Sequence, residues 1–240
     1  MPRVMAIVAL VYAVGVVPLA AQERTDSTAS RPVPLNPQRL TVGRDSFAIL
    51  LQGSPFGTFT RTRERDPSHV TITTEFVISG GAQSATYVLD ASTLAPVSYD
   101  QTANQGGQSI ELHLIYGSGG HITGTIAGAL DATVDTVIQS IVYDEDMLPT
   151  VAEALELEDG SRHELDLFVA PRSATMPVAL VVLDGGTVAV PAGEFDTWLV
   201  TLEGGQLPWI YWVTKEVPRR IVKMEITGQL SFELVSAGSQ

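Results

Sequence analysis

The stretch that decides the fold runs from residue 185 to residue 235, GGTVAVPAGEFDTWLVTLEGGQLPWIYWVTKEVPRRIVKMEITGQLSFELV. Within it, short runs of β-branched and aromatic residues alternate with polar ones, and Gly, Pro or an acidic-Gly step closes each run. Period-two alternation between turn signals predicts consecutive antiparallel strands. All three tryptophans of the chain, Trp198, Trp209 and Trp212, fall here. We therefore expect large buried areas in this segment.

The same pattern extends upstream to about Arg44. In residues 69–78, HVTITTEFVI, every second residue from Val70 to Ile78 belongs to one face, and the intervening residues are mostly polar. By this count the chain has about twelve to fourteen strands, more than the ~10 that an open, strongly twisted sheet carries without curling. We predict a mainly β protein, with one large curved antiparallel sheet as a half-barrel or barrel-like meander, in a single domain over residues 43–236.

One segment departs from the alternation. In residues 144–160, DEDMLPTVAEALELEDG, apolar residues recur at helical spacing at Leu148, Val151, Ala152 and Leu155. We predict one short amphipathic helix packed on the sheet, with its glutamates on other faces, Asp146 capping its start and Gly160 ending it. Residues 132–144, ATVDTVIQSIVYD, are predicted to form one strand before it.

The amino-terminal residues predict export. Residues 1–21 have a basic residue at Arg3, an apolar run over residues 4–17 and a small-residue end at Leu19-Ala20-Ala21, which is typical of a signal peptide. The apolar run is shorter than the ~20 residues that a spanning helix needs. Residues 22–42 are polar and rich in proline, so we expect an extended or disordered lead-in. We expect the mature protein in the periplasm or outer envelope of a bacterium.

Composition excludes several kinds of partner. The chain has no cysteine, so neither a disulfide framework nor a lipidated cysteine is possible. Its 14 Lys and Arg face 27 Asp and Glu, for a formal net charge of −13. This charge disfavours binding to nucleic acid or to an anionic membrane surface.

The sequence shows no catalytic constellation. The four histidines occur in no metal-ligand spacing, and the glycine-rich turn at residues 117–121 lacks the helix and the lysine of a phosphate loop. We therefore expect no metal site, no cofactor and no enzymatic activity. A hydrolase whose site assembles from distant residues is the less favoured alternative, with His121 and His163 as the bases to test. We interpret the acidic run Asp144-Glu145-Asp146 as helix capping, with weak cation binding as the alternative.

A basic cluster lies among the aromatic residues of the carboxyl-terminal segment: Lys215, Arg219, Arg220 and Lys223 stand beside Trp209, Tyr211 and Trp212. Guanidinium groups next to aromatic rings could receive an anionic head group or a sugar. However, the basic residues alternate with apolar ones, which favours the solvated face of a hairpin.

These segments resemble a known family. A strand meander, the helix segment of residues 144–160 and then VAVPAGEFDTWLV and WIYWVTKEVPRRIVKME are similar to the bacterial exported family called domain of unknown function 3108. The residues that carry the resemblance are Val188, Val190, Pro191, Ala192, Gly193, Phe195, Trp212, Val213, Pro218, Arg219, Val222 and Glu225. The resemblance implies a curved antiparallel sheet wrapped part-way round one or two helices, and it supplies no enzyme activity. By architecture the family is similar to lipoprotein carriers, half-barrels of the bacterial envelope that hold acyl chains in the concave face.

Two functional hypotheses follow from the surplus of apolar strand surface. The first is a non-enzymatic envelope protein that binds a hydrophobic or amphipathic ligand, such as a lipid, in the concave face of its sheet. The residues expected to contact this ligand are Leu155, Trp198, Trp209, Tyr211, Trp212 and Arg220. The alternative is a structural module with a core plugged by its own side chains, whose aromatic hairpin meets another envelope protein.

Overall fold

Two antiparallel meanders share one sheet in the computed structural model, which describes residues 33–128, 131–226, 228 and 230–238. The first meander comprises β1 (Gly43–Leu51), β2 (Ser54–Arg65), β3 (His69–Ile78), β4 (Gly81–Asp90), β5 (Pro96–Gln105), β6 (Gln108–Tyr116), β7 (His121–Gly128) and β8 (Ala132–Val137). The second comprises β10 (Arg162–Val169), β11 (Ala174–Val190), β12 (Gly193–Glu203), β13 (Trp209–Thr214), β14 (Ile221–Ile226) and β15 (Leu230–Ala237). The predicted mainly β fold is confirmed.

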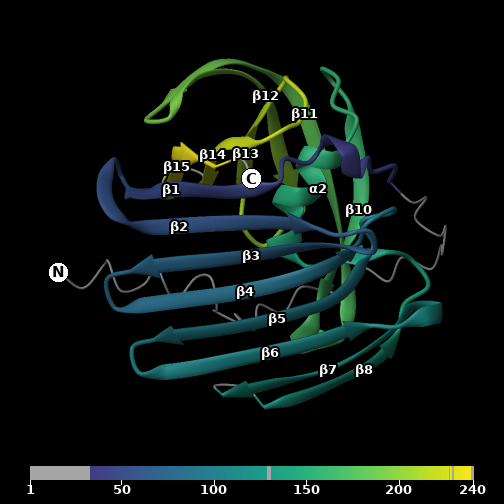
Figure 1. Ribbon diagram of the computed structural model, residues 1–240. Helices are drawn as coiled ribbons and strands as arrows, with labels where there is room; N and C mark the ends of the chain where they lie inside the picture. Colours follow the sequence, from purple (N-terminus) through teal and green to yellow (C-terminus); the bar gives the residue numbers. More distant parts are fainter. Residues whose placement is uncertain (1–32, 129–130, 227, 229, 239–240) are drawn as a thin grey trace.

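The meanders join where β1 pairs with β15, and the short strand β9 (Val142–Tyr143) adds to β10 in parallel. The 15 strands therefore follow the order β8-β7-β6-β5-β4-β3-β2-β1-β15-β14-β13-β12-β11-β10-β9. In Figure 1, β1–β8 run across the front of the molecule, and β10 and β11 stand nearly upright behind them. The sheet is thus strongly curved, as its strand number predicts.

The sheet does not close, although its two edges are neighbours along the chain. β8 and β9 form opposite edges, yet only residues 138–141 connect them. The prediction of a single strand over residues 132–144 is therefore wrong. Alternation continues through this segment, but the Ile138 amide donates to the Gly120 carbonyl (2.9 Å) and the chain then leaves the first edge.

The hairpin of β11 and β12 is longer than the sequence indicates. Gly185 and Gly186 look like a turn, but β11 continues through them with a shift of register against β12. A Cβ at Gly185 would lie 2.7 Å from Thr197 Oγ1, so glycine is required for this close approach of the two strands. The chain turns instead at Pro191 and Ala192.

The helix lies inside the curve of the sheet (Figure 1). A 3-10 turn, η3 (Glu145–Met147), leads into α2 (Leu148–Ala154), whose residues are all buried except Pro149. The predicted amphipathic helix is therefore corrected in two respects. It ends at Leu155 and not near Gly160, and it has no solvated face, because the sheet surrounds it.

Buried charges hold α2 in place. Glu153 is fully buried and accepts hydrogen bonds from Arg61 Nη1 (3.0 Å), Arg63 Nη1 (3.2 Å) and the Ile221 amide (2.9 Å). Arg63 also pairs with buried Asp45, and the network thereby connects α2 to β1, β2 and β14. Buried charges are tolerated when they are paired and hydrogen-bonded in this way.

The segment before β1 is ordered where the structure describes it. Residues 33–42 contain the 3-10 turn η1 (Pro37–Arg39), and Leu40 is buried beside a bridge to Arg219. The Asn36 amide donates to the carbonyl of Ala154 at the end of α2 (2.9 Å), so the disordered lead-in predicted up to residue 42 is corrected for this part. Residues 1–32, with the predicted signal peptide, lie outside the described residues. Within the described part, no helix is long and apolar enough to cross a membrane.

Candidate functional site

A cavity of about 360 Å³ lies between the two meanders, above the turn that begins α2. Both meanders contribute to its wall: strands β2 to β7 on one side and strands β13 to β15 on the other. The rest of the lining comes from η3, the start of α2, the end of β10 with residues 170–172, and residues 206–207 before β13. The volume falls in the range of small-molecule pockets, ~300–1,000 Å³.

The wall of the cavity is largely aromatic and aliphatic. Phe232 on β15 is central, because its ring lies 5.6 Å from that of Phe59, 6.2 Å from that of Phe76 and 5.8 Å from that of Trp209. Trp209 also stacks on Tyr211, with ring centroids 6.0 Å apart. The aliphatic and small residues of the wall include Ile78, Ala103, Ile110, Leu112, Ile126, Met224, Ile226 and Leu230. Such a wall suits an apolar ligand body.

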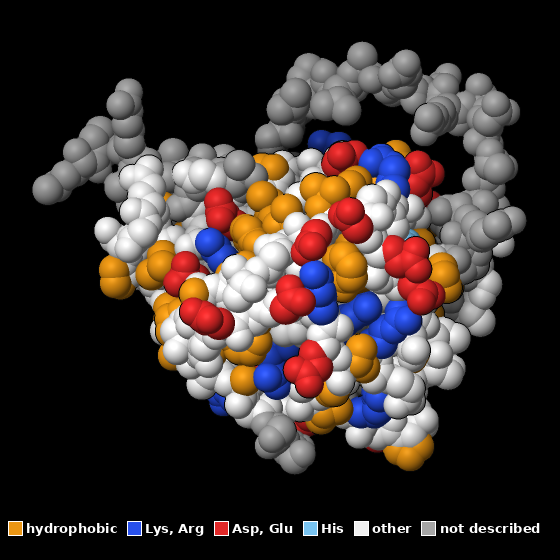
Figure 2. All heavy atoms as spheres, turned by 90° about the horizontal axis from the view of Figure 1, so that it is seen from above, with side chains coloured by type: hydrophobic (Ala, Val, Ile, Leu, Met, Phe, Trp, Pro, Cys, Tyr) orange, Lys and Arg blue, Asp and Glu red, His pale blue; other side chains and the backbone are white. Residues whose placement is uncertain are grey.

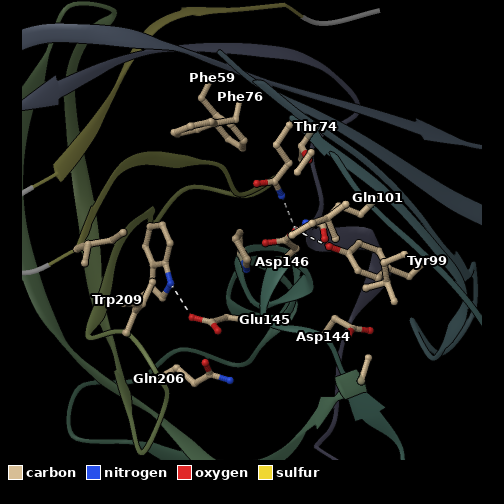
Figure 3. Close-up of a pocket in the computed structure, with 18 of the residues that line it drawn as sticks. Phe59, Thr74, Phe76, Tyr99, Gln101, Asp144, Glu145, Asp146, Gln206 and Trp209 are labelled. Carbon is tan, nitrogen blue, oxygen red and sulfur yellow. Dashed lines mark hydrogen bonds between the residues drawn. The ribbon is translucent and has the colours of Figure 1, made fainter. Parts of the chain in front are cut away.

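Three successive carboxyl groups form the floor: Asp144, Glu145 and Asp146. In Figure 3, Glu145 reaches towards Trp209 on one side and Asp146 towards Tyr99 on the other. Trp209 Nε1 donates to Glu145 Oε1 (2.9 Å), and Tyr99 OH donates to Asp146 Oδ2 (2.5 Å). The predicted capping role is therefore wrong, because neither η3 nor α2 has a side-chain cap and these acids bond to the strands around them.

Burial raises the pKa of each of these three acids. Loss of water raises the pKa of Asp144 to about 7, against the hydrogen bond from Tyr116 and with added repulsion from Asp146. Loss of water and the same repulsion raise the pKa of Glu145 to about 7. The pKa of Asp146 is also raised, mainly by desolvation. At neutral pH the floor therefore holds a mixture of protonated and ionised carboxyl groups.

The floor acids have no cationic partner in the part of the chain that the structure describes. Among the described residues, no Lys or Arg forms an ion pair with Asp144, Glu145 or Asp146, although such pairs occur elsewhere in the molecule. The sequence explains this, because residues 66–161 contain no Lys or Arg at all. Arg172, which is exposed, is the basic residue that the described lining contains. The described residues also contain no group of acids and histidines arranged to hold a metal ion.

The structure places the six predicted ligand-binding residues in different environments. Trp209 and Tyr211 line the cavity, whereas Leu155, Trp198, Trp212 and Arg220 do not. Lys215 Nζ lies 4.9 Å from the ring centroid of Trp198, and Lys223 Nζ lies 4.9 Å from that of Trp212.

Leu155 and Arg220 belong to the framework that holds the helix. The Leu155 carbonyl accepts from Arg39 Nη1 (2.7 Å) and from Arg219, and Arg220 Nε lies 2.9 Å from Asp45 Oδ1. The predicted solvated basic face is thus corrected at Arg219, which is only 6% exposed, and at Arg220, which pairs with a buried acid. Neither guanidinium group is available to a ligand in the cavity.

The two histidines proposed as hydrolytic bases lie away from the cavity. His121 Nε2 is 2.7 Å from Asp135 Oδ1 on the neighbouring strand, and His163 Nε2 is 3.3 Å from Ser161 Oγ. Neither residue lines the cavity, and the two are on β7 and β10.

Comparison with known families agrees with this architecture. The family model described as "Protein of unknown function (DUF3108)" matches residues 46–235, which is most of the chain. The chain belongs to the DUF3108 family. The match spans both meanders, η3 and α2, so the two walls and the floor of the cavity lie inside the region shared with DUF3108.

Two solved structures are similar to this DUF3108 chain. The first is described as a β-barrel-like protein of domain of unknown function DUF1849 from Brucella abortus, with 16% identity and a TM-score of 0.50 over 85% of this chain and 97% of that one. The second is a DUF1089 family protein from Pseudomonas aeruginosa, with 15% identity and a TM-score of 0.41 over 71% of this chain and 89% of that one. No curated protein matches the sequence. The first similarity supports the β-barrel-like fold.

Sequence reasoning missed most of the cavity. The acids of the floor were visible as a run, and the absence of Lys and Arg from residues 66–161 was a signal that no nearby cation could pair with them. Phe232 carried no such signal, because its strand β15 is far in sequence from β2 and β3, which hold its neighbours Phe59 and Phe76.

Proposed function

We propose that this protein is an exported, non-enzymatic binding module that holds a hydrophobic or amphipathic ligand in the cavity between its two meanders. The observation that carries the proposal is the cavity itself, about 360 Å³ in volume and walled by aromatic and aliphatic side chains. A folded core normally fills such space with its own side chains. At about 30 Å³ for each water molecule, the volume equals roughly a dozen waters. It therefore suits a small apolar ligand or one acyl chain.

Three further arguments support this proposal. The signal-peptide pattern of residues 1–21 supports export to the bacterial envelope. The alternative of a core plugged by its own side chains does not account for a cavity of this size. On the face shown in Figure 2, acidic and basic side chains are interspersed with apolar ones, so that face offers no wide apolar area for a protein partner.

The test is ligand uptake by the mature protein, purified from an exporting host without detergent. Native mass spectrometry followed by organic extraction should show a co-purifying apolar mass. After delipidation, the protein should take up N-phenylnaphthylamine, an uncharged dye whose fluorescence rises in an apolar site.

A matched pair of variants locates the binding site. Ala103 is buried and lines the cavity, whereas Thr102 is its exposed neighbour on the outer face of β5. Ala103→Phe should fill the cavity and abolish dye uptake with the far-ultraviolet circular dichroism unchanged, and Thr102→Phe should leave uptake intact. A protein that purifies without any bound mass and takes up no dye would refute the proposal, as would equal binding by both variants.

A further inference from the structure

The acidic groups of the cavity lie together at one end, and the exposed Arg172 is the basic residue of the described lining. The wall is largely apolar, with uncharged polar side chains such as Thr74 and Gln101, and the floor holds three carboxyl groups within three consecutive residues, Asp144 to Asp146. A ligand that fits this cavity therefore has an apolar body and one polar end. The chemistry of the floor decides which polar end is favoured.

Each carboxyl group keeps an oxygen available. Tyr116 donates to Asp144 Oδ2, Trp209 to Glu145 Oε1, and Gln83, Tyr99 and Gln101 to Asp146 Oδ2. Among the described residues, the second oxygen of each group has no protein donor within hydrogen-bond distance. Asp144, Glu145 and Asp146 line the cavity, and none of their oxygens is among the buried polar atoms without a partner, so the second oxygens are open to the cavity. A donor on a ligand in the cavity can therefore reach them.

The ionisable side chains around the floor do not donate to these second oxygens. Tyr116 on β6 and Tyr211 on β13 are neutral phenols, because loss of water raises the pKa of each above its ordinary value, and Tyr99 on β5 already donates to Asp146 Oδ2. Arg172 is exposed and forms no ion pair with the floor acids. Arg61 is buried and is already paired with Glu153. Within the part of the chain that the structure describes, the floor is therefore a set of acids without a counter-ion.

We propose that the ligand is an amphipathic amine, whose protonated nitrogen lies at Asp144, Glu145 and Asp146 while its apolar body occupies the aromatic cavity. An ammonium group has up to three donors for the unpaired oxygens. It also benefits from aromatic faces, and Trp209 presents one beside Glu145. This inference rests on the proposed function, because it names the class of ligand for the same cavity.

Other head groups fit less well. An acyl carboxylate or a phosphate would add like charge to the floor, which disfavours ionisation of every acid there. Arg220 could have received an anionic head, but it is paired with Asp45 and lies outside the cavity. A bare metal ion is disfavoured because the described acids do not converge as a ligand set.

The experiment is displacement of N-phenylnaphthylamine by three probes with the same apolar chain: dodecylamine, dodecanol and dodecanoate. At pH 7.5 we expect dodecylamine to displace the dye at a concentration at least tenfold lower than dodecanol, and dodecanoate to be the weakest. At pH 5 the amine stays protonated but the floor acids gain protons, so the advantage of the amine over the alcohol should shrink, with dodecanol unchanged.

Two variants tie this preference to the floor. Glu145→Gln should reduce the advantage of the amine severalfold and leave displacement by dodecanol unaltered, whereas the exposed Glu111→Gln on β6 should change neither. If dodecanol and dodecylamine displace the dye equally, or dodecanoate is strongest, the amine inference fails while the proposed function stands. If no probe binds and no dye is taken up, the proposed function itself fails.

Discussion

At the scale of single residues, Asp144 shows how the cavity opposes the stability of the fold. Its folded pKa of about 7 lies above the 3.8 of the unfolded chain, mainly because the carboxyl group loses water. An acid whose pKa is raised in the folded state favours folding only while it is protonated. Its contribution is therefore greatest below about pH 4, falls as the pH rises to about 7 and is constant above that.

We expect the substitution Asp144→Asn to stabilise the protein at high pH. Asparagine keeps the acceptor for Tyr116 but cannot ionise, so the variant avoids the cost of a buried charge. At about 1.4 kcal/mol per pKa unit, its gain in unfolding free energy over the parent should be about 2–3 kcal/mol larger at pH 8 than at pH 5. Urea unfolding at both pH values measures this, with Glu111→Gln as the exposed control. A gain independent of pH would contradict the assignment.

Trp209 should report the titration of its neighbour. Its indole N–H donates to Glu145, whose pKa is raised to about 7 by burial. We expect the tryptophan emission to change with a midpoint near pH 7, because a charge appears beside the ring. Trp209→Phe and Glu145→Gln should each remove this transition. The ring of Trp212 lies beside Lys223 instead, so Trp212→Phe should leave the transition in place. A transition that survives Glu145→Gln would assign it to another group.

At the scale of elements, α2 is held by a buried charge network as well as by its buried apolar residues. Glu153 is fully buried and accepts from Arg61, Arg63 and the Ile221 amide. Removing one partner of a buried ion pair leaves the other charge without compensation, which costs about 3–5 kcal/mol. We expect Glu153→Gln to lower the free energy of unfolding by that amount, as measured by chemical denaturation.

Glu156 provides the matched control for α2. It lies just after the helix, with its side chain 68% exposed and 3.4 Å from Arg39. Exposed pairs contribute about 0–1 kcal/mol, so Glu156→Gln should have little effect on stability. Similar losses from Glu153→Gln and Glu156→Gln would show that the buried network does not hold the helix.

At the scale of the whole molecule, the two meanders depend on one seam. Ile49 on β1 is fully buried and pairs in register with Phe232 on β15, the residue at the centre of the aromatic wall. We expect Ile49→Ala to cost about 2–5 kcal/mol and to reduce hydrogen-exchange protection equally in β4 and in β13. Val235 lies on β15 with Phe232 but is 47% exposed, so Val235→Ala should change neither the stability nor the hydrogen-exchange protection. Loss of protection in one meander alone would indicate two independent units.

Most of the strands, their antiparallel order within each meander, the curvature and the family could be predicted from the sequence, although residues 132–144 form two strands and β11 continues through Gly186. Period-two alternation and turn residues are local, and they are readable wherever one face is buried. The alternation of Val70, Ile72 and Thr74 on one face is an example that the structure reproduces.

Only the tertiary structure decided what lies inside the sheet. Glu153 has the helical spacing of a solvated residue, yet it is buried, because the sheet curls round α2 and supplies two arginines from β2. Likewise, the acids Asp144 to Asp146 have the pattern of helix capping, yet they form the floor of a cavity. Alternation tells which residues share a face of a strand, but not which distant strands face one another across a curved sheet. The physical environment of a side chain depends on that second relation, which is set by the curvature of the whole sheet.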